Sequence, residues 1–442
     1  MGPEINTVES DSALPSQADV VVIGGGVIGL TSALFLSKRG VKVVLVEKGG
    51  IACEQSSRNW GWCRQAVRDP REFDLIREAL RLWRGMNEQC QVDTGFRSTG
   101  ILFAARSEAD DVQYREWSSK AAQSGIQTRM VSGAELAELL PGDADLPKSA
   151  LYCDSDGRAE PQWAGPAFAL AARRLGATLL TQCAARGIET AGGRVSAVIT
   201  ERGVLKSSTV VVAGGAWSRR ILRDLRVSLP QLKVRASVAR TTAVENGPVP
   251  ALWDGRTAFR KRADGGYTIA DGSPIVVPLT PDCFRYFPHF TPMLTMEWKG
   301  LRLRVDERFL TEWHEAAPRP WDRPSPYEAT RILDPRPDQK YLDALMARLR
   351  NRYPAFANAR IAQSWAGFID TTPDAVPVIS DVERITGLIV AAGFSGHGFG
   401  ISPGAGHLVA DLACGVKPIV DPREFRLSRF FDGSKPRPTT GV

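Results

Sequence analysis

The chain has 442 residues, of which 43% are apolar and 24% are charged. This length exceeds one ordinary hydrophobic core and predicts about two or three domains, while the composition excludes a disordered or fibrous protein. The formal charge of +7 comes from residues spread along the sequence. That distribution argues against a nucleic-acid-binding protein and fits an anionic cofactor and substrate.

The N-terminal segment, residues 1–17, is polar and acidic. It lacks a basic stretch followed by an apolar block, and no apolar run of the chain reaches the roughly 18 residues of a membrane span. These features predict a cytoplasmic protein without an integral membrane span. The seven cysteines form no CxxC pair and the four histidines no HxxxH pair, which predicts reduced thiols and no metal site.

The region after this segment predicts a strand, a tight turn and a helix. The β-branched run from Val20 to Ile23 is typical of a strand buried on both faces, and a helix is expected from Ile28 to Lys38. Between them, Gly24, Gly26 and Gly29 form a GxGxxG pattern. Such glycines allow the turn, let backbone N–H groups approach a pyrophosphate, and let the helix pack closely on the sheet.

An acidic residue completes this motif. A second strand, from Val43 to Val46, ends at Glu47, where a carboxylate can accept hydrogen bonds from a ribose. Strand, glycines, helix, strand and acid agree with one another, so we predict a site for an adenine dinucleotide. The motif alone leaves NAD and FAD open, because both present the same pyrophosphate.

Two later segments again join an apolar strand to glycines. Residues 209–212 run into the sequence AGGAWS at 213–218, after a helix expected at 161–175. Residues 388–391 run into six glycines between 393 and 406, and a helix follows. Glycine-rich backbone can lie close against a ligand, and a helix N-terminus stabilises negative charge.

The middle of the chain is expected to contact the substrate. Residues 257–271 predict a hairpin with its turn at 264–266. Residues 277–331 are rich in Phe, Tyr, Trp and Pro, and we expect an irregular stretch that acts as a lid, an oligomer contact or a hydrophobic cover. The candidate pocket residues in this part are Tyr267, Arg285, Tyr286 and His289.

Taken together, these segments resemble the D-amino acid oxidase superfamily of FAD-dependent oxidoreductases, and more narrowly its glycine oxidase, sarcosine oxidase and D-amino acid dehydrogenase branch. The resemblance spans nearly the whole chain in the family's order. The matching pieces are VVVIGGGVIGLTSALFLSKRGVKVVLVEKG, SSRNWGW, VVAGGAWS, WAGFIDTTPDAVPVIS and AAGFSGHGFGISPGAGHLVADL.

The resemblance implies an α/β fold with FAD as the cofactor. A Rossmann-like FAD-binding domain is expected at residues 1–95, 150–228 and 362–442, and a discontinuous α+β substrate-binding domain with an antiparallel sheet at 96–149 and 229–361. The cofactor-binding residues implied are Gly24, Gly26, Val27, Ile28, Gly29, Glu47, Lys48, Ser56, Ser57, Arg58, Asn59, Trp60, Gly61, Trp62, Ala185, Ala213, Gly214, Trp217, Gly393, Ser395, Gly396, His397, Gly398, Phe399 and Gly400.

The resemblance also implies the chemistry. Such an enzyme moves a hydride from the carbon next to nitrogen to the flavin, and water hydrolyses the resulting imine. Arginine holds a carboxylate through two parallel hydrogen bonds. The family pattern makes Arg64 the first candidate for that task and Arg68 the second, with Tyr267 and His289 as further catalytic candidates. The electron acceptor is O2 or another acceptor.

The sequence departs from the family pattern at three places. The WAG triplet is followed by Phe368 and Ile369 where glycine oxidases have an arginine nearby, Gly400 stands where sarcosine oxidases have a lysine, and Gly367 falls where they have a flavin-linking cysteine. We therefore expect noncovalent FAD and an amine that is bulkier or differently charged than glycine or sarcosine.

Three alternatives stay open. The first is oxidation of a 2-hydroxy acid or polyol, with His289 as the base. The second is an FAD subunit of a heteromeric amine or opine dehydrogenase, whose partner would contact the aromatic stretch. The third and weakest is an RNA-modifying flavoprotein, although we expect no nucleic-acid partner. A homo-oligomer is also compatible with the sequence.

Overall fold

The computed structural model describes residues 2–272, 275–317 and 319–439. Within them, one sheet has six strands in the order β21, β22, β13, β1, β2, β9, and only β21 runs antiparallel to its neighbour. Nearly all of its side chains are buried because helices or a further sheet cover both faces. The strands are β1 (Val20–Ile23), β2 (Val43–Val46), β9 (Thr178–Leu180), β13 (Thr209–Val212), β21 (Val378–Asp381) and β22 (Leu388–Ala392).

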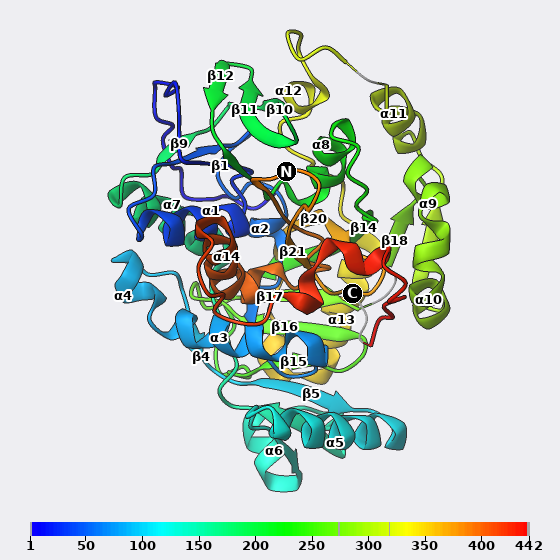
Figure 1. The fold of residues 1–442 in the computed structure, drawn as a ribbon. Coiled ribbons are helices and arrows are strands. Elements are labelled where there is room, and N and C mark those ends of the chain that lie inside the picture. Colours follow the sequence, from blue (N-terminus) through cyan, green and yellow to red (C-terminus); the bar gives the residue numbers. More distant parts are fainter. Residues whose placement is uncertain (1, 273–274, 318, 440–442) are drawn as a thin grey trace.

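The helices expected from the sequence cover one face of this sheet. There α1 (Val27–Ser37) packs between α7 (Pro161–Arg174) and α14 (Gly398–Cys414), and α3 (Phe73–Arg84) packs on α14 (Figure 1). Their shared core includes Leu30, Leu34 and Val409. The predicted strands at 20–23, 43–46 and 209–212 are confirmed with their boundaries, and the predicted helices at 28–38 and 161–175 are confirmed to within one residue.

The opposite face of this sheet carries a small three-stranded sheet and a short helix. The elements are β10 (Ala185–Ala191), β11 (Arg194–Thr200), β12 (Gly203–Lys206) and α8 (Ser218–Asp224). In the core on this side, Val21 and Val44 of the six-stranded sheet pack with Val198 of β11 and Leu222 of α8.

A second large sheet has ten strands within the described residues. Its order is β19, β18, β14, β17, β16, β15, β5, β7, β6, with β20 paired to β14 outside this path. Only β15 with β5 and β18 with β19 are parallel pairs. The strands are β5 (Ile101–Ala105), β6 (Arg129–Ser132), β7 (Ser149–Cys153), β14 (Leu232–Thr241), β15 (Ala251–Trp253), β16 (Thr257–Lys261), β17 (Tyr267–Asp271), β18 (Ile275–Pro278), β19 (Leu301–Arg304) and β20 (Ile361–Thr371).

The strands of the two large sheets come largely from different predicted domains. All six strands of the first sheet come from the segments that we assigned to the FAD-binding domain. However, β7 and β20 belong to the second sheet although we assigned nearly all of their residues to that same domain. The domain boundaries therefore stay a prediction, and pairing favours moving these two strands to the substrate-binding part.

The stretch that we expected to be irregular is mostly helical. It forms α9 (Pro281–Arg285), α10 (Phe287–Glu297), the edge strand β19 and α11 (Arg308–Glu315), which lie along one side of the molecule (Figure 1). Pro281 and Pro288 lie within the first two positions of α9 and α10, where they cost no helical backbone hydrogen bond, whereas Pro292 lies inside α10. The prediction of an irregular stretch is therefore wrong, whereas its richness in apolar and aromatic residues stands.

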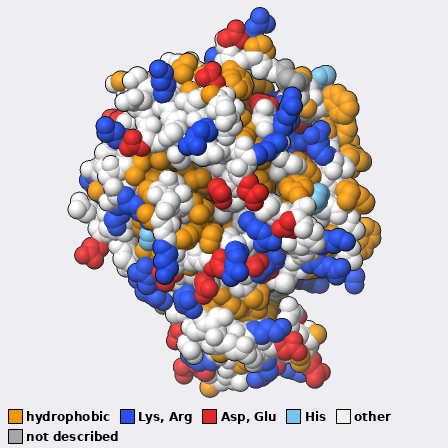
Figure 2. Space-filling view, in the orientation of Figure 1, with side chains coloured by type: hydrophobic (Ala, Val, Ile, Leu, Met, Phe, Trp, Pro, Cys, Tyr) orange, Lys and Arg blue, Asp and Glu red, His pale blue; other side chains and the backbone are white. Residues whose placement is uncertain are grey.

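Large apolar side chains are exposed along this helical stretch. They form the apolar edge that Figure 2 shows beside α9 to α11. No helix in the described part of the chain is long and apolar enough to cross a membrane. The exposed residues of this stretch are Phe284, Phe287, Met296, Trp298, Leu303, Val305, Leu310 and Trp313.

The remaining elements complete the frame around the site. A small sheet joins β3 (Trp62–Cys63), β8 (Gly157–Arg158) and β4 (Arg97–Ser98). Six further helices of the described residues lie around the two large sheets. They are α2 (Gln55–Arg58), α4 (Met86–Cys90), α5 (Glu108–Gln123), α6 (Gly133–Leu139) and α13 (Gln339–Arg352), and the short helix α12 spans Pro326–Ala329.

Candidate active site

A cavity of about 700 Å³ is lined by residues from both large sheets. From the parallel sheet it takes the loop after β1, the end of β2 and the loops after β13 and β22. From the antiparallel sheet it takes side chains of β14 and β20, among them Val238 and Phe368. Ligand sites of α/β proteins commonly lie at the carboxyl ends of such parallel strands, and this size is within the usual range for ligand pockets.

The turn between β1 and α1 is shaped by two glycines. Gly24 has φ +116°, and a Cβ there would lie 2.4 Å from the carbonyl oxygen of Ala213. A Cβ on Gly29 would lie 2.0 Å from the carbonyl oxygen of Gly24. Only glycine fits at either position, because one needs the left-handed backbone and both need the space. Gly24 therefore lines the cavity, whereas Gly29 keeps α1 tight against the strand.

The N-terminus of α1 opens onto the cavity. Gly26 caps the helix without a side-chain hydrogen bond, the first turn carries no acidic residue, and the N–H of Val27 donates to Ser56 Oγ at 2.9 Å. Unpaired N–H groups and the helix dipole make such an end suitable for an anion. A pyrophosphate is the group that this end of the cavity fits.

Glu47 is held rigidly at the end of β2. Its Oε2 accepts from the N–H of Gly25 and its Oε1 from the N–H of Gly49, both at 2.7 Å. Burial raises the pKa of this carboxyl, and Lys48 and the two backbone donors act against that shift. Each oxygen keeps a free lone pair beside the cavity, so the carboxylate can accept the two hydroxyl hydrogens of a ribose.

The loop after Glu47 is held by its own side chains. Arg58 donates to the carbonyl oxygen of Ala366 at 2.8 Å and pairs with Asp334 at 2.7 Å. Asn59 accepts from the N–H of Gly61 at 2.7 Å. Arg58 thus binds the strand of the second sheet to the loop of the first, which fixes the wall between the two halves of the cavity.

The glycine-rich loop before α14 forms the opposite wall. Asp370 at the end of β20 accepts from the N–H of Gly393 at 2.7 Å and from Gln231 at 3.1 Å. Burial raises the pKa of Asp370 to about 6, and these donors oppose the shift. The first turn of α14 contains no acidic residue, and His397, Gly398 and Phe399 at its start line the cavity. This helix end adds a second region of positive potential.

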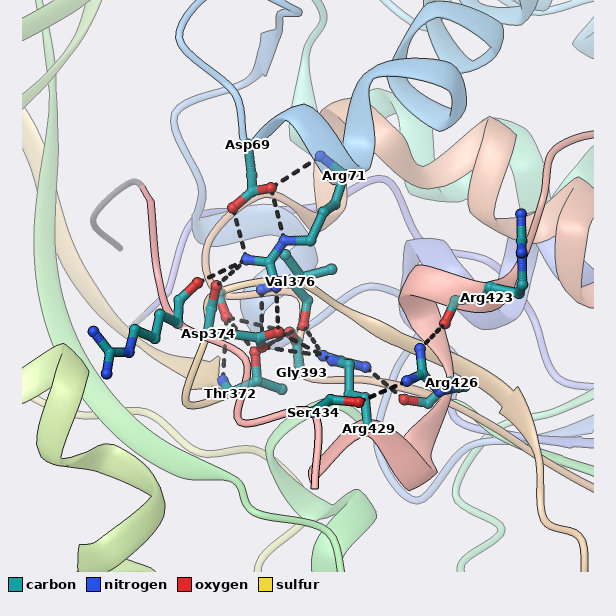
Figure 3. A network of polar contacts seen from close by, with 12 residues as sticks. Asp69, Arg71, Thr372, Asp374, Val376, Gly393, Arg423, Arg426, Arg429 and Ser434 are labelled. Atoms are coloured by element: carbon teal, nitrogen blue, oxygen red, sulfur yellow. Dashed lines mark hydrogen bonds and ion pairs between the residues drawn. The ribbon is translucent and has the colours of Figure 1, made fainter. Parts of the chain in front are cut away.

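A buried ion network holds this loop from behind (Figure 3). Asp374 accepts from Arg429 at 3.0 and 3.1 Å and from Arg71 at 3.0 Å, and Arg71 also pairs with Asp69 at 2.7 Å. Thr439 Oγ1 donates to Asp69 at 2.6 Å and lies in the cavity wall. The network therefore joins the start of α3, the loop after β20 and the C-terminal segment.

Arginines form the cationic end of the cavity. Arg64 is half-buried, with its guanidinium 5.2 Å from the ring of Phe103. Within the described part of the chain, only its Nη1 is hydrogen-bonded, to backbone carbonyls. Arg68 is 3% exposed, and its Nε and Nη1 have no partner among the described residues. Burial, and then Arg68, holds the pKa of Arg64 well below its usual range. Buried guanidinium groups without acceptors are typical of a site for an anion.

Aromatic rings surround this cationic end. Trp60 meets Trp62 edge to face at 5.1 Å and stacks with Trp253 at 5.8 Å. Phe103 contacts Trp62 at 6.3 Å and Tyr114 at 6.1 Å. All five rings line the cavity. They give it a wall that excludes water and fits an apolar or aromatic group.

Most residues expected to bind the cofactor line the cavity. Six do not, since Gly29, Ser57, Gly61, Gly393, Ser395 and Gly400 support the wall from behind. At Gly400, for example, a Cβ would lie 2.8 Å from the carbonyl oxygen of Trp62. Those that line it are Gly24, Gly26, Val27, Ile28, Glu47, Lys48, Ser56, Arg58, Asn59, Trp60, Trp62, Ala185, Ala213, Gly214, Trp217, Gly396, His397, Gly398 and Phe399.

Two of the three catalytic candidates lie elsewhere. Tyr267 is fully buried outside the cavity, where its hydroxyl donates to the carbonyl oxygen of Pro248 at 2.7 Å. His289 on α10 packs against Phe431 and does not line the cavity. Tyr286 and Arg285 are also outside it. Tyr267 and His289 therefore lie outside the cavity, and of the catalytic candidates Arg64 lines it, with Arg68 beside it.

Sequence reasoning missed several cavity residues. Phe103, Tyr114 and Trp253 come from β5, α5 and the end of β15, far from every glycine motif. Met296 and Glu297 come from the end of α10. An isolated aromatic residue in a strand carries no local signal of which face it occupies, so only the fold could bring these side chains to the site.

Comparison with known proteins agrees with this geometry. A family described as FAD dependent oxidoreductase (DAO) matches residues 19–412. Sarcosine oxidase subunit beta of Rhodobacter capsulatus is 24% identical over 425 residues, which cover 94% of this chain and 89% of that protein. Glycine oxidase of Bacillus subtilis is 24% identical over 401 residues, with 89% and 92% covered.

Length and structure give two further comparisons. Mouse mitochondrial sarcosine dehydrogenase is 24% identical over 432 residues, but the chain spans only 42% of that protein while 94% of the chain is covered. L-amino acid deaminase from Proteus myxofaciens, solved in complex with anthranilate, superposes with a TM-score of 0.93 at 34% identity, and 96% of each chain is covered.

Proposed function

Because the chain belongs to the DAO family of FAD-dependent oxidoreductases, we propose that it oxidises the C–N bond of an amino acid or an N-substituted amino acid. Bound FAD supplies the acceptor for the hydride that leaves the carbon next to nitrogen, and water hydrolyses the imine that remains. The FAD is held without a covalent link, because glycine occupies position 367, where the sarcosine oxidase pattern has a flavin-linking cysteine.

The observation that carries this proposal is that the guanidinium of Arg64 is only partly hydrogen-bonded by the described residues. It lines the cavity that contains the dinucleotide turn, and its Nε and Nη2 have no acceptor among the described residues. A carboxylate can receive two parallel hydrogen bonds from these atoms. That contact would orient the amino acid and leave its nitrogen and adjacent carbon free to face the cofactor.

The other cavity residues support a substrate with a large apolar group. Trp62, Phe103 and Tyr114 stand close to Arg64 and present rings with little competing polarity. They would hold an aromatic or branched side chain and exclude water from the reacting carbon. The anthranilate bound to the Proteus myxofaciens deaminase, itself an aromatic carboxylate, is consistent with this preference.

The test is anaerobic reduction of the FAD-loaded protein, followed as bleaching near about 450 nm, where oxidised flavin absorbs. The screen includes D- and L-amino acids, N-methyl and cyclic amino acids, opines and 2-hydroxy acids. Bleaching by an amino compound supports C–N oxidation, and recovery on admitting air separates O2 from another electron acceptor. Bleaching by 2-hydroxy acids alone would contradict the proposal.

Hydroxy acid oxidation is the weaker enzyme alternative. It calls for a base beside the substrate hydroxyl, and the histidine that we expected for it, His289, does not line the cavity. His397 lines it, but burial and the nearby Arg68 and Arg64 hold the pKa of this imidazole well below its usual range. A weakly basic histidine is a poor acceptor for a hydroxyl proton.

A heteromeric enzyme is the second candidate. Curated relatives of the chain include a protein named as the beta subunit of sarcosine oxidase, and the exposed apolar edge of α9 to α11 offers a surface for a partner. Size-exclusion chromatography with light scattering on the protein made alone tests this. An inactive, aggregating chain favours a missing partner, whereas an active monomer or homo-oligomer excludes the need for one. The predicted cytoplasmic location is tested by cell fractionation.

A further inference from the structure

A buried carboxyl group lies behind the arginine end of the cavity. Glu72 is the last residue of a short 3-10 helix, Pro70–Glu72, directly before α3, and it is fully buried. Neither of its carboxyl oxygens has a hydrogen-bond partner among the described residues. A buried carboxylate without donors is costly, so its presence calls for a specific explanation.

Charged and titratable groups from two segments face Glu72. Arg64, Arg68, Asp69 and Arg71 approach it from its own loop, and His397 at the start of α14 places Nδ1 3.7 Å from Glu72 Oε2. Burial raises the pKa of Glu72 to about 7, while Arg68, Arg64 and Arg71 oppose the shift and Asp69 adds to it. Near neutral pH we therefore expect both the protonated and the ionised form of Glu72 to be populated.

A second buried acid nearby differs in this respect. Asp156 accepts from the N–H of Gln65 at 2.8 Å and from the N–H of Ala66 at 3.1 Å, one bond to each carboxylate oxygen. These donors favour its ionised form, while burial raises its pKa to about 6. Glu72 has no such donors, so the arginines are what stabilise its charge.

We propose that Glu72 takes up one proton when a carboxylate ligand binds beside Arg64 and Arg68. The inference rests on the proposed function for the identity of that ligand. The incoming carboxylate places a second negative charge near the guanidinium groups that stabilise ionised Glu72. Protonation of Glu72 restores the net charge at the cationic end of the cavity, because one anion enters and one proton is added. Glu72 is thus a positioning residue that acts through Arg68.

The sign of the pH dependence follows from this exchange. Below about pH 6, Glu72 is already protonated in the free protein, so binding takes up no proton. Above about pH 7, the free protein must gain the proton on binding, and affinity for a carboxylate falls by about tenfold per pH unit. For an amino acid substrate this weakening is expected in KM and not in kcat.

The experiment uses the FAD-loaded protein and anthranilate, whose groups do not titrate between about pH 6 and about pH 9. Isothermal titration calorimetry in two buffers of different ionisation enthalpy counts the protons taken up on binding. We expect an uptake of about one proton near pH 8 and much less near pH 6. Absence of uptake near pH 8 would overturn the proposal without any variant, and so would absence of saturable binding.

A substitution assigns the proton to its residue. Glu72→Gln keeps the shape and removes the titration, so the uptake should disappear and the affinity near pH 9 should equal that of the unmodified protein near about pH 6. The control is Glu78→Gln on the adjoining helix α3, where the side chain is partly exposed and pairs with Arg81. That variant should take up the proton normally.

The contradicting result is proton uptake that persists in Glu72→Gln, because His397 or Asp156 would then be the titrating group. Failure of the proposed function looks different. If no amino compound bleaches the flavin while anthranilate binding still takes up a proton through Glu72, the anion site stands and the C–N assignment fails. If amino acids bleach the flavin without any linked proton, the opposite holds.

Discussion

The glycine turn before α1 and the cationic end around Arg64 and Arg68 are two parts of one cavity. They differ in how far their polar groups are already hydrogen-bonded within the protein. In the turn, Glu47 and Ser56 already accept backbone N–H groups, so the protein itself fixes their geometry. At the cationic end, Arg68 and Glu72 are buried, and some of their polar atoms have no hydrogen-bond partner among the described residues. A satisfied group holds a shape for its ligand, whereas an unsatisfied group depends on the ligand to complete it.

The first prediction breaks the turn. Gly29→Val would place a side chain where even Cβ lies 2.0 Å from the carbonyl oxygen of Gly24. We expect FAD affinity to fall by about a hundredfold or more, so that the protein purifies without flavin absorbance. Gly40→Ala is the control, since it lies beyond the other end of α1 and no atom lies within 4 Å of the added Cβ. Equal flavin content in both variants would contradict the assignment of the turn.

The second prediction removes a satisfied charge. Asp374→Asn leaves Arg429 and Arg71 without their buried carboxylate, so we expect a loss of about 3–5 kcal/mol in the free energy of unfolding. Guanidinium unfolding measures it. The control is Asp421→Asn, an exposed partner of Arg423, which should change the free energy of unfolding far less. A small effect at Asp374 would mean that the network in Figure 3 is not rigid.

The third prediction concerns the unsatisfied acid in the absence of ligand. The pKa of Glu72 is raised in the folded protein from 4.5 to about 7. Its contribution to stability is therefore complete below the unfolded pKa and is lost as pH rises through about 7. At about 1.4 kcal/mol per pKa unit this amounts to about 3 kcal/mol.

The Glu72→Gln variant isolates that contribution. Urea unfolding between about pH 5 and about pH 9 should show a steeper loss of stability for the unmodified protein than for the variant. Asp156 and Asp370, whose pKa values burial raises to about 6, contribute a decline of the same sign at slightly lower pH. The variant should keep that part. Identical pH profiles would contradict the state assigned to Glu72.

The smallest effect is expected at a residue that the structure places in the core. Tyr267→Phe loses only the hydrogen bond to the carbonyl oxygen of Pro248, so we expect about 1 kcal/mol of lost stability and unchanged flavin reduction. Thermal unfolding and stopped-flow bleaching measure the two quantities. A large loss of reduction rate with normal stability would return Tyr267 to the catalytic candidates.

The local parts of the fold could be predicted from the sequence because their signals are local. The strand at Val20–Ile23, the glycine turn and the strand at Thr209–Val212 each follow from a run of a few residues. The helices α9 and α10 did not, because Pro292 inside α10 argues against a helix and the sequence does not show that Pro281 and Pro288 lie in the first turns.

The site was predicted in part for a similar reason. Residues in or just after the segments that carry the family resemblance, such as Arg64 after SSRNWGW, line the cavity. Tyr267 did not, because neighbouring residues of a strand face opposite sides of a sheet, and the sequence of β17 does not reveal which face meets the cavity. Tyr267 and Ile269 face one core, whereas Ala270 faces the other, which contains Trp62 and Val238.

The most direct test of the proposed function compares two substrates in one variant. Anaerobic flavin reduction is measured with phenylalanine and with 2-phenylethylamine, which lacks the carboxylate, in the unmodified protein, in Arg64→Met and in the surface control Arg77→Met. We expect Arg64→Met to slow reduction by phenylalanine by about a hundredfold to a thousandfold and reduction by the amine by much less. Equal losses with the two compounds would contradict the role of Arg64 as the carboxylate anchor.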